Sequence, residues 1–249
     1  MKPITLTNSS AATAPSCRNC PVRSRCLPGG VDDIVLERLD RQLVRRLAVK
    51  RHHTLCRKGD PCAQLYAIRQ GQFKREHTVP GGMRVLGFYA PGQVMGFDGI
   101  GSDAYNCNTV ALTDSVVCAI PYPAVIPLLG QDAQLQRNFH RMMGDEIVCQ
   151  QAATVLLGNL KAAPRLAGFL LDQAARFAQG GAAPARFVLC MSRYDIASYL
   201  GLTVESISRL LAIFRQARAL QVRNRSVELL DLDLLGGIAS GKEQDRAVG

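Results

Sequence analysis

The feature that most constrains the fold is a change in hydrophobic period part-way along the chain. Within residues 54–120, short apolar runs alternate with turn signals such as Pro91-Gly92. Within residues 133–160, apolar residues recur at three- and four-residue steps, and no proline interrupts them. The first pattern predicts a compact antiparallel β barrel or roll, and the second predicts a long helix. We therefore expect an α+β fold, which a chain of 249 residues is long enough to divide into more than one domain.

The same signals predict the order of the parts. The β-roll domain is expected to begin with a helix at residues 32–47, where Leu36, Leu39 and Leu43 recur at near-helical spacing. The expected parts are an N-terminal cysteine segment at residues 1–30, a β-roll domain at 31–130, a long helix at 131–160, a helical C-terminal domain at 161–235 and a frayed tail at 236–249.

Two apolar stripes run along the predicted long helix. Two stripes suit two neighbours, which would be the β-roll domain and the same helix of a second copy. A helix fully buried within one chain is the alternative. We favour a homodimer, because so long a helix has few other elements to cover it. The residues expected to contribute to pairing are Leu135, Phe139, Met142, Met143, Ile147 and Leu156.

The C-terminal domain contains the most specific local signal, a helix-turn-helix. Ser192 is placed to cap a short helix that runs through Leu200. Gly201 is placed in the turn, and Thr203 is placed to cap a second helix. An ordinary helical hairpin with a solvated polar face is the alternative. The residues expected on the outward side of the second helix, where a recognition helix meets base edges, are Val204, Glu205, Ser208 and Arg209.

The charge of the chain favours a polyanionic partner. The formal net charge is +10 and the pI is about 9.4. Between residues 161 and 225, ten Lys and Arg residues outnumber three Asp and Glu residues. Arg209 can form paired hydrogen bonds to guanine, and Glu205 can accept one from cytosine. A β hairpin expected at residues 222–229 adds arginines for phosphate contacts. We therefore expect double-stranded DNA as a partner.

Three of the nine cysteines lie close together near the N-terminus. Cys17, Cys20 and Cys26 have two and five residues between them, in a stretch whose prolines and glycines predict a loop. Thiolates at this spacing can converge on one metal centre, which needs a further ligand from elsewhere in the chain. The chain shows neither a secretory signal nor an apolar stretch of membrane length, so we expect a cytoplasmic protein with no membrane partner. In that reducing compartment, clustered thiols more often bind metal than form disulfides.

The thiol spacing alone does not distinguish an iron–sulfur cluster from a zinc ion, because four thiolates also bind zinc in a closed tetrahedron. An electron carrier or redox enzyme could use the same cluster. The sequence lacks a Gly-rich phosphate loop, a nucleophile elbow and paired carboxylates in a matching context. We therefore do not expect an enzyme.

Several motifs in the same order resemble one family of regulators. The segment YLGLTVESISRLL at 199–211 occurs together with LYAIR at 65–69, GFDGIG at 96–101 and the three N-terminal cysteines. Over about residues 16–231, the chain resembles the FNR (fumarate and nitrate reduction regulator) branch of the cyclic-AMP receptor protein superfamily. The resemblance implies a bacterial, oxygen-responsive transcription regulator with a [4Fe-4S] cluster and a winged helix-turn-helix. It also implies a homodimer that binds an inverted repeat similar to TTGAT-N4-ATCAA, with RNA polymerase as a further partner.

The resemblance also implies which residues bind the cluster. On the matching positions the ligands are Cys17, Cys20, Cys26 and Cys118, and Cys107 is the alternative to Cys118. Cyclic nucleotides are not expected, because the chain has no Lys or Arg between residues 84 and 137 to neutralise a buried phosphate. We therefore expect the integrity of the cluster to control dimerisation, and dimerisation to control DNA binding.

Overall fold

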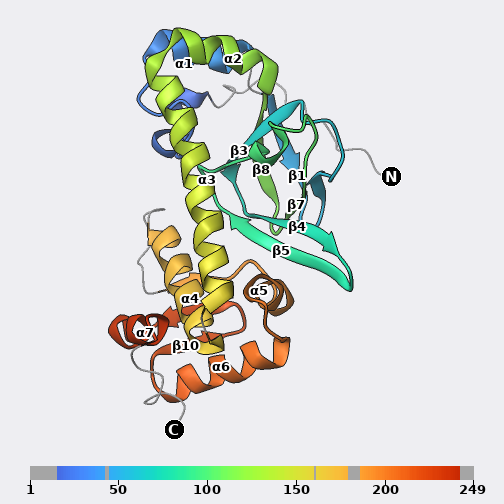
Figure 1. Cartoon of the computed structure of the whole chain (residues 1–249). Helices are drawn as coiled ribbons and strands as arrows, with labels where there is room; N and C mark the ends of the chain where they lie inside the picture. The colour runs from blue at the N-terminus through green and yellow to red at the C-terminus, as the bar shows by residue number, and fades with distance from the viewer. Residues whose placement is uncertain (1–15, 43–44, 160, 179–185, 242–249) are drawn as a thin grey trace. The chain divides into compact units, whose positions relative to one another are not determined.

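The computed structural model describes residues 16–42, 45–159, 161–178 and 186–241 (Figure 1). The chain divides into two compact units, of which the first ends at Val148 and the second begins at Cys149. One long helix contributes residues to both units. Each unit is described by itself below.

Two four-stranded antiparallel sheets form the centre of the N-terminal unit (Figure 1). The first sheet contains, in spatial order, β1 (Arg45–Val49), β8 (Ser115–Pro121), β3 (Gln64–Gln70) and β6 (Val94–Met95). The second sheet contains β2 (Thr54–Cys56), β7 (Asn108–Ala111), β4 (Phe73–Val79) and β5 (Gly82–Tyr89). The neighbours in each sheet are mostly not consecutive in sequence, so the chain crosses between the two sheets. The predicted β roll is confirmed.

Strand β3 separates two apolar cores, because its side chains point alternately to its two faces. Leu65 and Ala67 lie in the first core, which also receives residues from helices on either side of the roll. Ile68 lies in the second core with Phe73. The helices of this unit are η1 (Cys17–Asn19), η2 (Arg23–Arg25), α1 (Asp33–Gln42), η3 (Phe97–Gly99), α2 (Tyr122–Gln131) and the first part of α3 (Ala133–Asn159).

The first helix is shorter than predicted. Helix α1 ends at Gln42 and β1 begins at Arg45, so the helix expected at residues 32–47 is wrong in its last part. Leu47 pairs with Val117 in the first sheet and packs against the second core. Apolar spacing alone did not locate this boundary, because a short apolar run does not distinguish a helix from a strand. Leu43 lies outside the described residues.

Helix α3 confirms the predicted long helix, but its apolar stripe is used differently. Leu135, Phe139 and Met142 are 0 %, 5 % and 7 % exposed and lie in the first core of their own unit. Met143 packs against the same core. These four side chains are therefore covered, fully or in part, within their own unit, and their part in pairing stays a prediction. Of the other two, Ile147 is exposed and Leu156 is partly exposed.

The C-terminal unit confirms the predicted winged helix-turn-helix. Ser192 accepts a hydrogen bond from the Asp195 N–H, and Asp195 accepts one from the Ser192 N–H at 2.9 Å, which caps the first helix. Thr203 accepts a hydrogen bond from the Ser206 N–H at 3.1 Å and caps the second. Gly201 makes the turn at a φ of 63°, where glycine is favoured. The elements are α4 (Ala162–Ala178), β9 (Arg186–Val188), α5 (Arg193–Leu200), α6 (Val204–Gln216), β10 (Leu220–Arg223), β11 (Ser226–Leu229) and α7 (Leu232–Ala239).

Helix α7 occupies part of the predicted tail. It is capped by Asp231 and buries Leu235 and Ile238, so apolar packing extends the fold beyond residue 235. Residues 242–249 of the predicted tail lie outside the described residues. Within the described part of the chain, no single helix is long and apolar enough to span a membrane. Helices α5 and α6 reach the required length and apolar content only as a pair bent by 100°.

Candidate metal centre and DNA-binding surface

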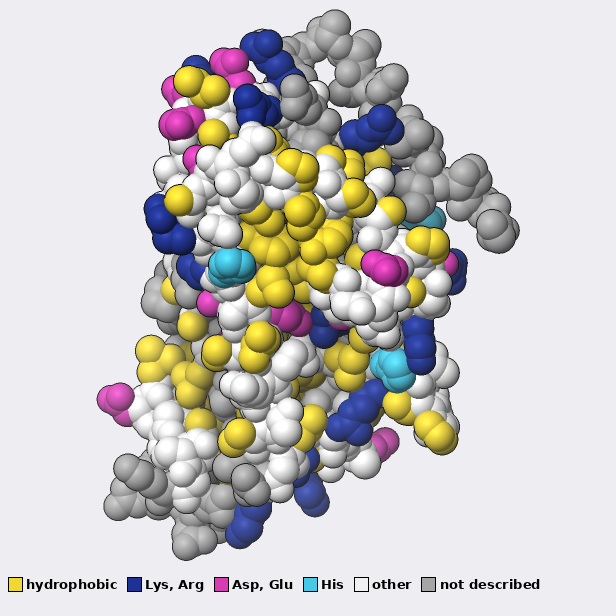
Figure 2. Space-filling view, turned by 45° about the horizontal axis from the view of Figure 1, so that its top comes forward, with side chains coloured by type: hydrophobic (Ala, Val, Ile, Leu, Met, Phe, Trp, Pro, Cys, Tyr) yellow, Lys and Arg dark blue, Asp and Glu magenta, His cyan; other side chains and the backbone are white. Residues whose placement is uncertain are grey.

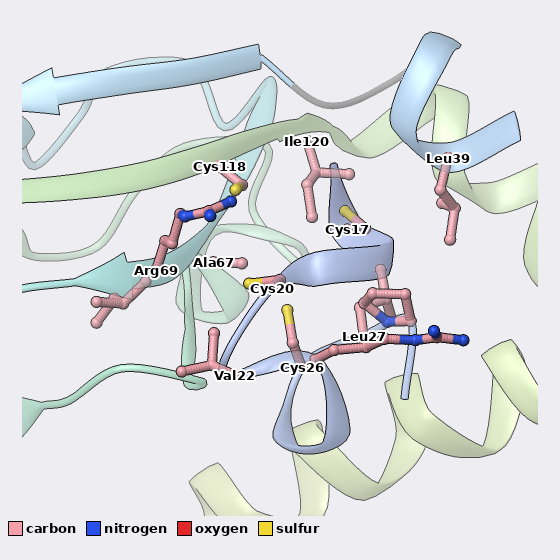
Figure 3. Close-up of a pocket in the computed structure, with 13 residues that line it drawn as sticks. Cys17, Cys20, Val22, Cys26, Leu27, Leu39, Ala67, Arg69, Cys118 and Ile120 are labelled. Atoms are coloured by element: carbon pink, nitrogen blue, oxygen red, sulfur yellow. The ribbon is translucent and has the colours of Figure 1, made fainter. Parts of the chain in front are cut away.

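Four cysteine thiols line one pocket of the N-terminal unit (Figure 3). Cys17, Cys20 and Cys26 come from the N-terminal loop, and Cys118 comes from β8. The empty space, counted with its open mouth, is about 500 Å³, and its walls are mostly apolar. The structure therefore brings together the four residues that the sequence resemblance named as ligands. The alternative, Cys107, is buried outside this pocket.

The N-terminal loop holds its thiols at the corners of two short turns. The Cys20 N–H donates to the Cys17 carbonyl at 3.3 Å, and the Cys26 N–H closes the second turn at 3.1 Å. Gly29 lies close to the backbone of the second turn. A Cβ atom added at Gly29 would lie only 2.9 Å from the Ser24 carbonyl oxygen. These turns let three thiols face one space, which a continuous helix would not allow at this spacing.

Cys118 lies inside the first sheet, where the strand register sets its neighbours. Arg46 of β1 is directly opposite Cys118 on one side, and Ala67 of β3 is directly opposite on the other. Directly paired residues share a sheet face. Ala67 has only a methyl side chain and lines the pocket, so this face leaves room beside the thiol. Arg69 of β3 also lines the pocket, and its guanidinium lies beside Cys118 in Figure 3.

Burial is the largest influence on the pKa of Cys17, Cys26 and Cys118. It raises the pKa of Cys17 to about 12 and the pKa of Cys26 to about 12, because a thiolate loses its hydration in an apolar pocket. Burial also raises the pKa of Cys118, while the guanidinium groups of Arg46 and Arg69 act in the opposite direction. A metal centre that binds these residues as thiolates must therefore displace their protons.

As they lie in the described structure, the four thiols do not converge on a single ion. Among the described residues, no three or more His, Cys, Asp or Glu side chains form a set that could hold one metal ion. The four thiols instead surround a cavity (Figure 3). Soft thiolate donors around an apolar cavity suit an iron–sulfur cluster. The Nε atom of Arg46 is buried with no hydrogen-bond partner, so the sheet beside Cys118 retains an unused donor.

Asn138 is a buried polar residue that the sequence analysis missed. Its Nδ2 atom donates to the carbonyl oxygens of Leu27 at 2.9 Å and Gly29 at 2.6 Å. Leu27 directly follows the ligand candidate Cys26, and Asn138 belongs to α3. The side chain therefore ties the cysteine loop to the long helix. The sequence did contain a signal for a buried polar residue, because Asn138 interrupts an apolar stripe of the predicted helix.

The second helix of the helix-turn-helix, α6, presents a polar side from its first turns. Its apolar side is buried within the C-terminal unit. Glu205 and Arg209 are exposed, and Val204 and Ser208 are partly exposed. The Oγ atom of Ser208 accepts a hydrogen bond from Arg193 of α5 at 3.1 Å. All four residues predicted to contact DNA thus reach the surface, with Glu205 and Arg209 the most accessible.

The hairpin of β10 and β11 forms the wing beside these helices. It belongs to a three-stranded sheet of order β10-β11-β9. Arg223 pairs with Ser226, which leaves a two-residue turn in which Asn224 has a φ of 56°. Arg223 and Arg225 are exposed at the tip. Both side chains are therefore accessible, and contacts to phosphates stay a prediction.

Apolar side chains also gather on the surface of the N-terminal unit. Figure 2 shows them as a continuous area in the upper half of the view, where this unit lies. Helix α3 exposes three apolar side chains: Ile147 and Val148, in the N-terminal unit, are 56 % and 62 % exposed, and Val155, in the second unit, is 59 % exposed. Val148 and Val155 are one heptad apart and lie on one side of the helix. Ile147 was expected from the sequence and the two valines were not, although their seven-residue spacing was a signal.

Comparisons with known proteins match both units. Residues 46–132 match the family described as the cyclic nucleotide-binding domain, and residues 164–238 match the Crp-like helix-turn-helix domain. FixK2 from Bradyrhizobium japonicum has a similar structure, with a TM-score of 0.73 and 24 % sequence identity over 79 % of this chain and 97 % of that chain. This similarity supports the fold.

The sequence comparisons are more specific. The fumarate and nitrate reduction regulatory protein of Escherichia coli (strain K12) is 36 % identical over 231 residues, which is 92 % of each chain. The protein of the same name from Salmonella typhimurium (strain LT2) has the same identity and coverage. Both relatives are regulatory proteins by name, which agrees with the expectation that this chain is not an enzyme. The chain therefore belongs to the fumarate and nitrate reduction regulator (FNR) family of transcription regulators, with a β roll, a long helix and a helix-turn-helix DNA-binding domain.

Proposed function

We propose that this chain is an oxygen-responsive transcription regulator that needs a [4Fe-4S] cluster held by Cys17, Cys20, Cys26 and Cys118. The observation that carries the proposal is that these four thiols line one apolar cavity. Membership of the FNR family supports it. When bound, the cluster supplies an inorganic centre that dioxygen can oxidise and dismantle.

The proposed signal passes from the cysteine loop to α3. Binding of Cys26 in the centre restrains the loop next to Leu27, whose carbonyl oxygen accepts a hydrogen bond from Asn138. Asn138 is only 6 % exposed, so this bond is protected from competition by water. Release of Cys26 removes one restraint on the position of α3 and shifts the equilibrium away from the pairing arrangement.

The proposed active form is a cytoplasmic homodimer on DNA. Ile147, Val148 and Val155 of α3 are the side chains that a second copy would cover. Two copies related by a two-fold axis match an inverted repeat similar to TTGAT-N4-ATCAA, because each presents one α6 to one half-site. The base-reading residues in each half-site are Val204, Glu205, Ser208 and Arg209. RNA polymerase is the proposed partner at promoters.

We propose that no cyclic nucleotide acts as the effector, although residues 46–132 match a domain family named for that ligand. Arg75 is a buried cation of the roll, at 7 % exposure. It forms ion pairs with Glu146 at 3.1 Å and Asp98 at 3.5 Å. Two carboxylates thus already neutralise its charge, and no Lys or Arg occurs between residues 84 and 137. A buried phosphate would therefore lack a counter-charge.

Anaerobic purification of the full chain tests the proposal. We expect iron and acid-labile sulfide in equal amounts, a visible absorption band, and binding to the inverted repeat that is lost on exposure to air. Cys118→Ala should abolish the band, whereas the matched variant Cys107→Ala should keep it. Zinc in place of iron and sulfide, with DNA binding that air does not change, would establish a zinc-stabilised regulator instead.

A further inference from the structure

Two arginines flank the fourth thiol, and neither pairing of α3 nor DNA binding explains them. We propose that Arg46 and Arg69 are positioning residues of the cofactor site, which compensate the negative charge of the thiolate-bound cluster and raise its reduction potential. The inference rests on the proposed function, because it requires a cluster at the four thiols.

Arg46 is connected to two of the ligand candidates. It is directly opposite Cys118 in the register of β1 and β8. Its Nη2 atom lies 3.0 Å from Asp40 Oδ1, and the two side chains are only 22 % and 18 % exposed. The other carboxylate oxygen of Asp40 accepts a hydrogen bond from the Cys17 N–H at 3.0 Å. Arg46 therefore joins the sheet to the cysteine loop, and its buried Nε atom has no hydrogen-bond partner.

Arg69 reaches the same thiol from the opposite strand. It follows Ala67 by two residues on β3 and lines the pocket together with Cys118. Figure 3 shows its guanidinium beside the Cys118 sulfur. Cys118 thus has one arginine on each neighbouring strand.

The positive charges of Arg46 and Arg69 affect the reduction potential of the cluster. A [4Fe-4S]2+ core with four thiolates carries a net charge of −2, and one added electron makes it −3. Inside an apolar pocket, screening is weak, so nearby cations favour the more negative state. The two arginines therefore raise the reduction potential. By the same effect they disfavour the loss of one electron from the core to dioxygen, which would become superoxide.

The carboxylate of Asp40 provides an independent check on this explanation. It partly neutralises Arg46 in the wild-type chain. Arg46→Met leaves this carboxylate unpaired near the centre and should lower the potential. Asp40→Asn removes one negative charge with little change in shape and should raise the potential. The double variant Asp40→Asn/Arg46→Met should lie between these two, because the two charge effects oppose each other.

The test is an anaerobic redox titration of the reconstituted full chain, followed by electron paramagnetic resonance of the reduced cluster. We expect Arg46→Met and Arg69→Met each to shift the potential to more negative values, and the corresponding Lys variants to stay close to the wild type. A tenfold change in the one-electron equilibrium corresponds to 59 mV. The matched control is Arg45→Met. Arg45 is exposed and directly precedes Arg46 in β1, so its side chain faces the other side of the sheet.

The outcomes separate the two proposals. If no protein, including the wild type, incorporates iron and sulfide, the proposed function fails. If the cluster assembles but Arg46→Met and Arg69→Met have the potential of Arg45→Met, the role of the arginines is overturned. If a Met variant does not fold, Asp40→Asn tests the proposal in its place. An unchanged reduction potential in Asp40→Asn would exclude an effect of the Arg46–Asp40 charges on the cluster.

Discussion

At the scale of single residues, Asn138 combines burial with a long-range contact. Asn138→Ala removes the donor to the Leu27 and Gly29 carbonyl oxygens. We expect the free energy of unfolding to fall by about 1–3 kcal/mol, because two buried acceptors lose their partner. Urea unfolding of the full chain without cofactor measures this change. Arg137→Ala, at an exposed neighbouring position, should stay within about 0.5 kcal/mol of the wild type. Equal stability of the two variants would contradict the contact.

Cys56 tests whether the remaining thiols are inert. It is 3 % exposed, and burial, with Asp98 nearby, raises its pKa to about 12. The reactive thiolate is therefore scarce at pH 8 in the folded protein. We expect Cys56 to resist iodoacetamide in the native chain and to react fully in urea, as measured by mass spectrometry of peptides. Rapid labelling in the native chain would show that the second core opens at this position.

The same raised pKa has a consequence for stability. The folded state keeps the Cys56 proton, whereas the thiol in the unfolded chain loses it above its ordinary pKa of 9.0. This contribution to stability is therefore complete below about pH 9 and is lost as the pH rises from there towards 12. The raised pKa values of Cys17 and Cys26 act in the same direction without cofactor.

At the scale of elements, α3 packs its first part against its own core, and we propose that its exposed apolar side chains pair with a second copy. Ile147→Lys places a charge on the exposed apolar side of this helix. Covering an Ile side chain contributes about 1.5–3 kcal/mol, so the dimer dissociation constant should rise by at least about tenfold. Sedimentation of the cluster-loaded protein measures it. Ile34→Lys on α1, where Ile34 is 76 % exposed, is the matched control and should leave the constant unchanged. Equal dimer dissociation constants for Ile147→Lys and Ile34→Lys would show that Ile147 is not part of the pairing surface.

Helix α6 carries the prediction about base recognition. Arg209 is exposed near its start, and Arg215 is exposed in its last turn. Arg209→Ala should cost about 1–3 kcal/mol of DNA-binding free energy and relax specificity at one base pair, because a bidentate contact to guanine is lost. Binding to repeats substituted at each position locates that base pair, with Arg215→Ala as the control. A loss that is uniform over all sequences would assign Arg209 to a phosphate.

At the scale of the whole molecule, the proposed two-fold symmetric dimer requires a fixed spacing of half-sites. Insertion of five base pairs at the centre of the repeat turns one half-site to the opposite side of the duplex. We expect affinity to fall by about 10³-fold or more, to the level of non-specific DNA at the same salt concentration. Fluorescence anisotropy with labelled duplexes measures this loss. Undiminished binding would show that one chain alone recognises each half-site.

Sequence patterns predicted the parts of the fold whose signals are local. The caps Ser192 and Thr203 and the turn at Gly201 were all located correctly, because a cap or a turn depends on residues within a few positions. The end of α1 and the existence of α7 were not, because packing of Leu47, Leu235 and Ile238 decided them. The four thiols were identified through a resemblance of motifs and not through their spacing alone.

By itself the sequence determined the order of the parts, the helix-turn-helix with the polar side of its second helix, and the identity of the candidate ligands. Only the tertiary structure decided that Leu135 and Phe139 serve their own core, that Asn138 holds the cysteine loop, and that Arg46 stands opposite Cys118. The physical reason is distance along the chain. Strand register and core packing join residues that are far apart in sequence, and no local pattern encodes which of them will meet.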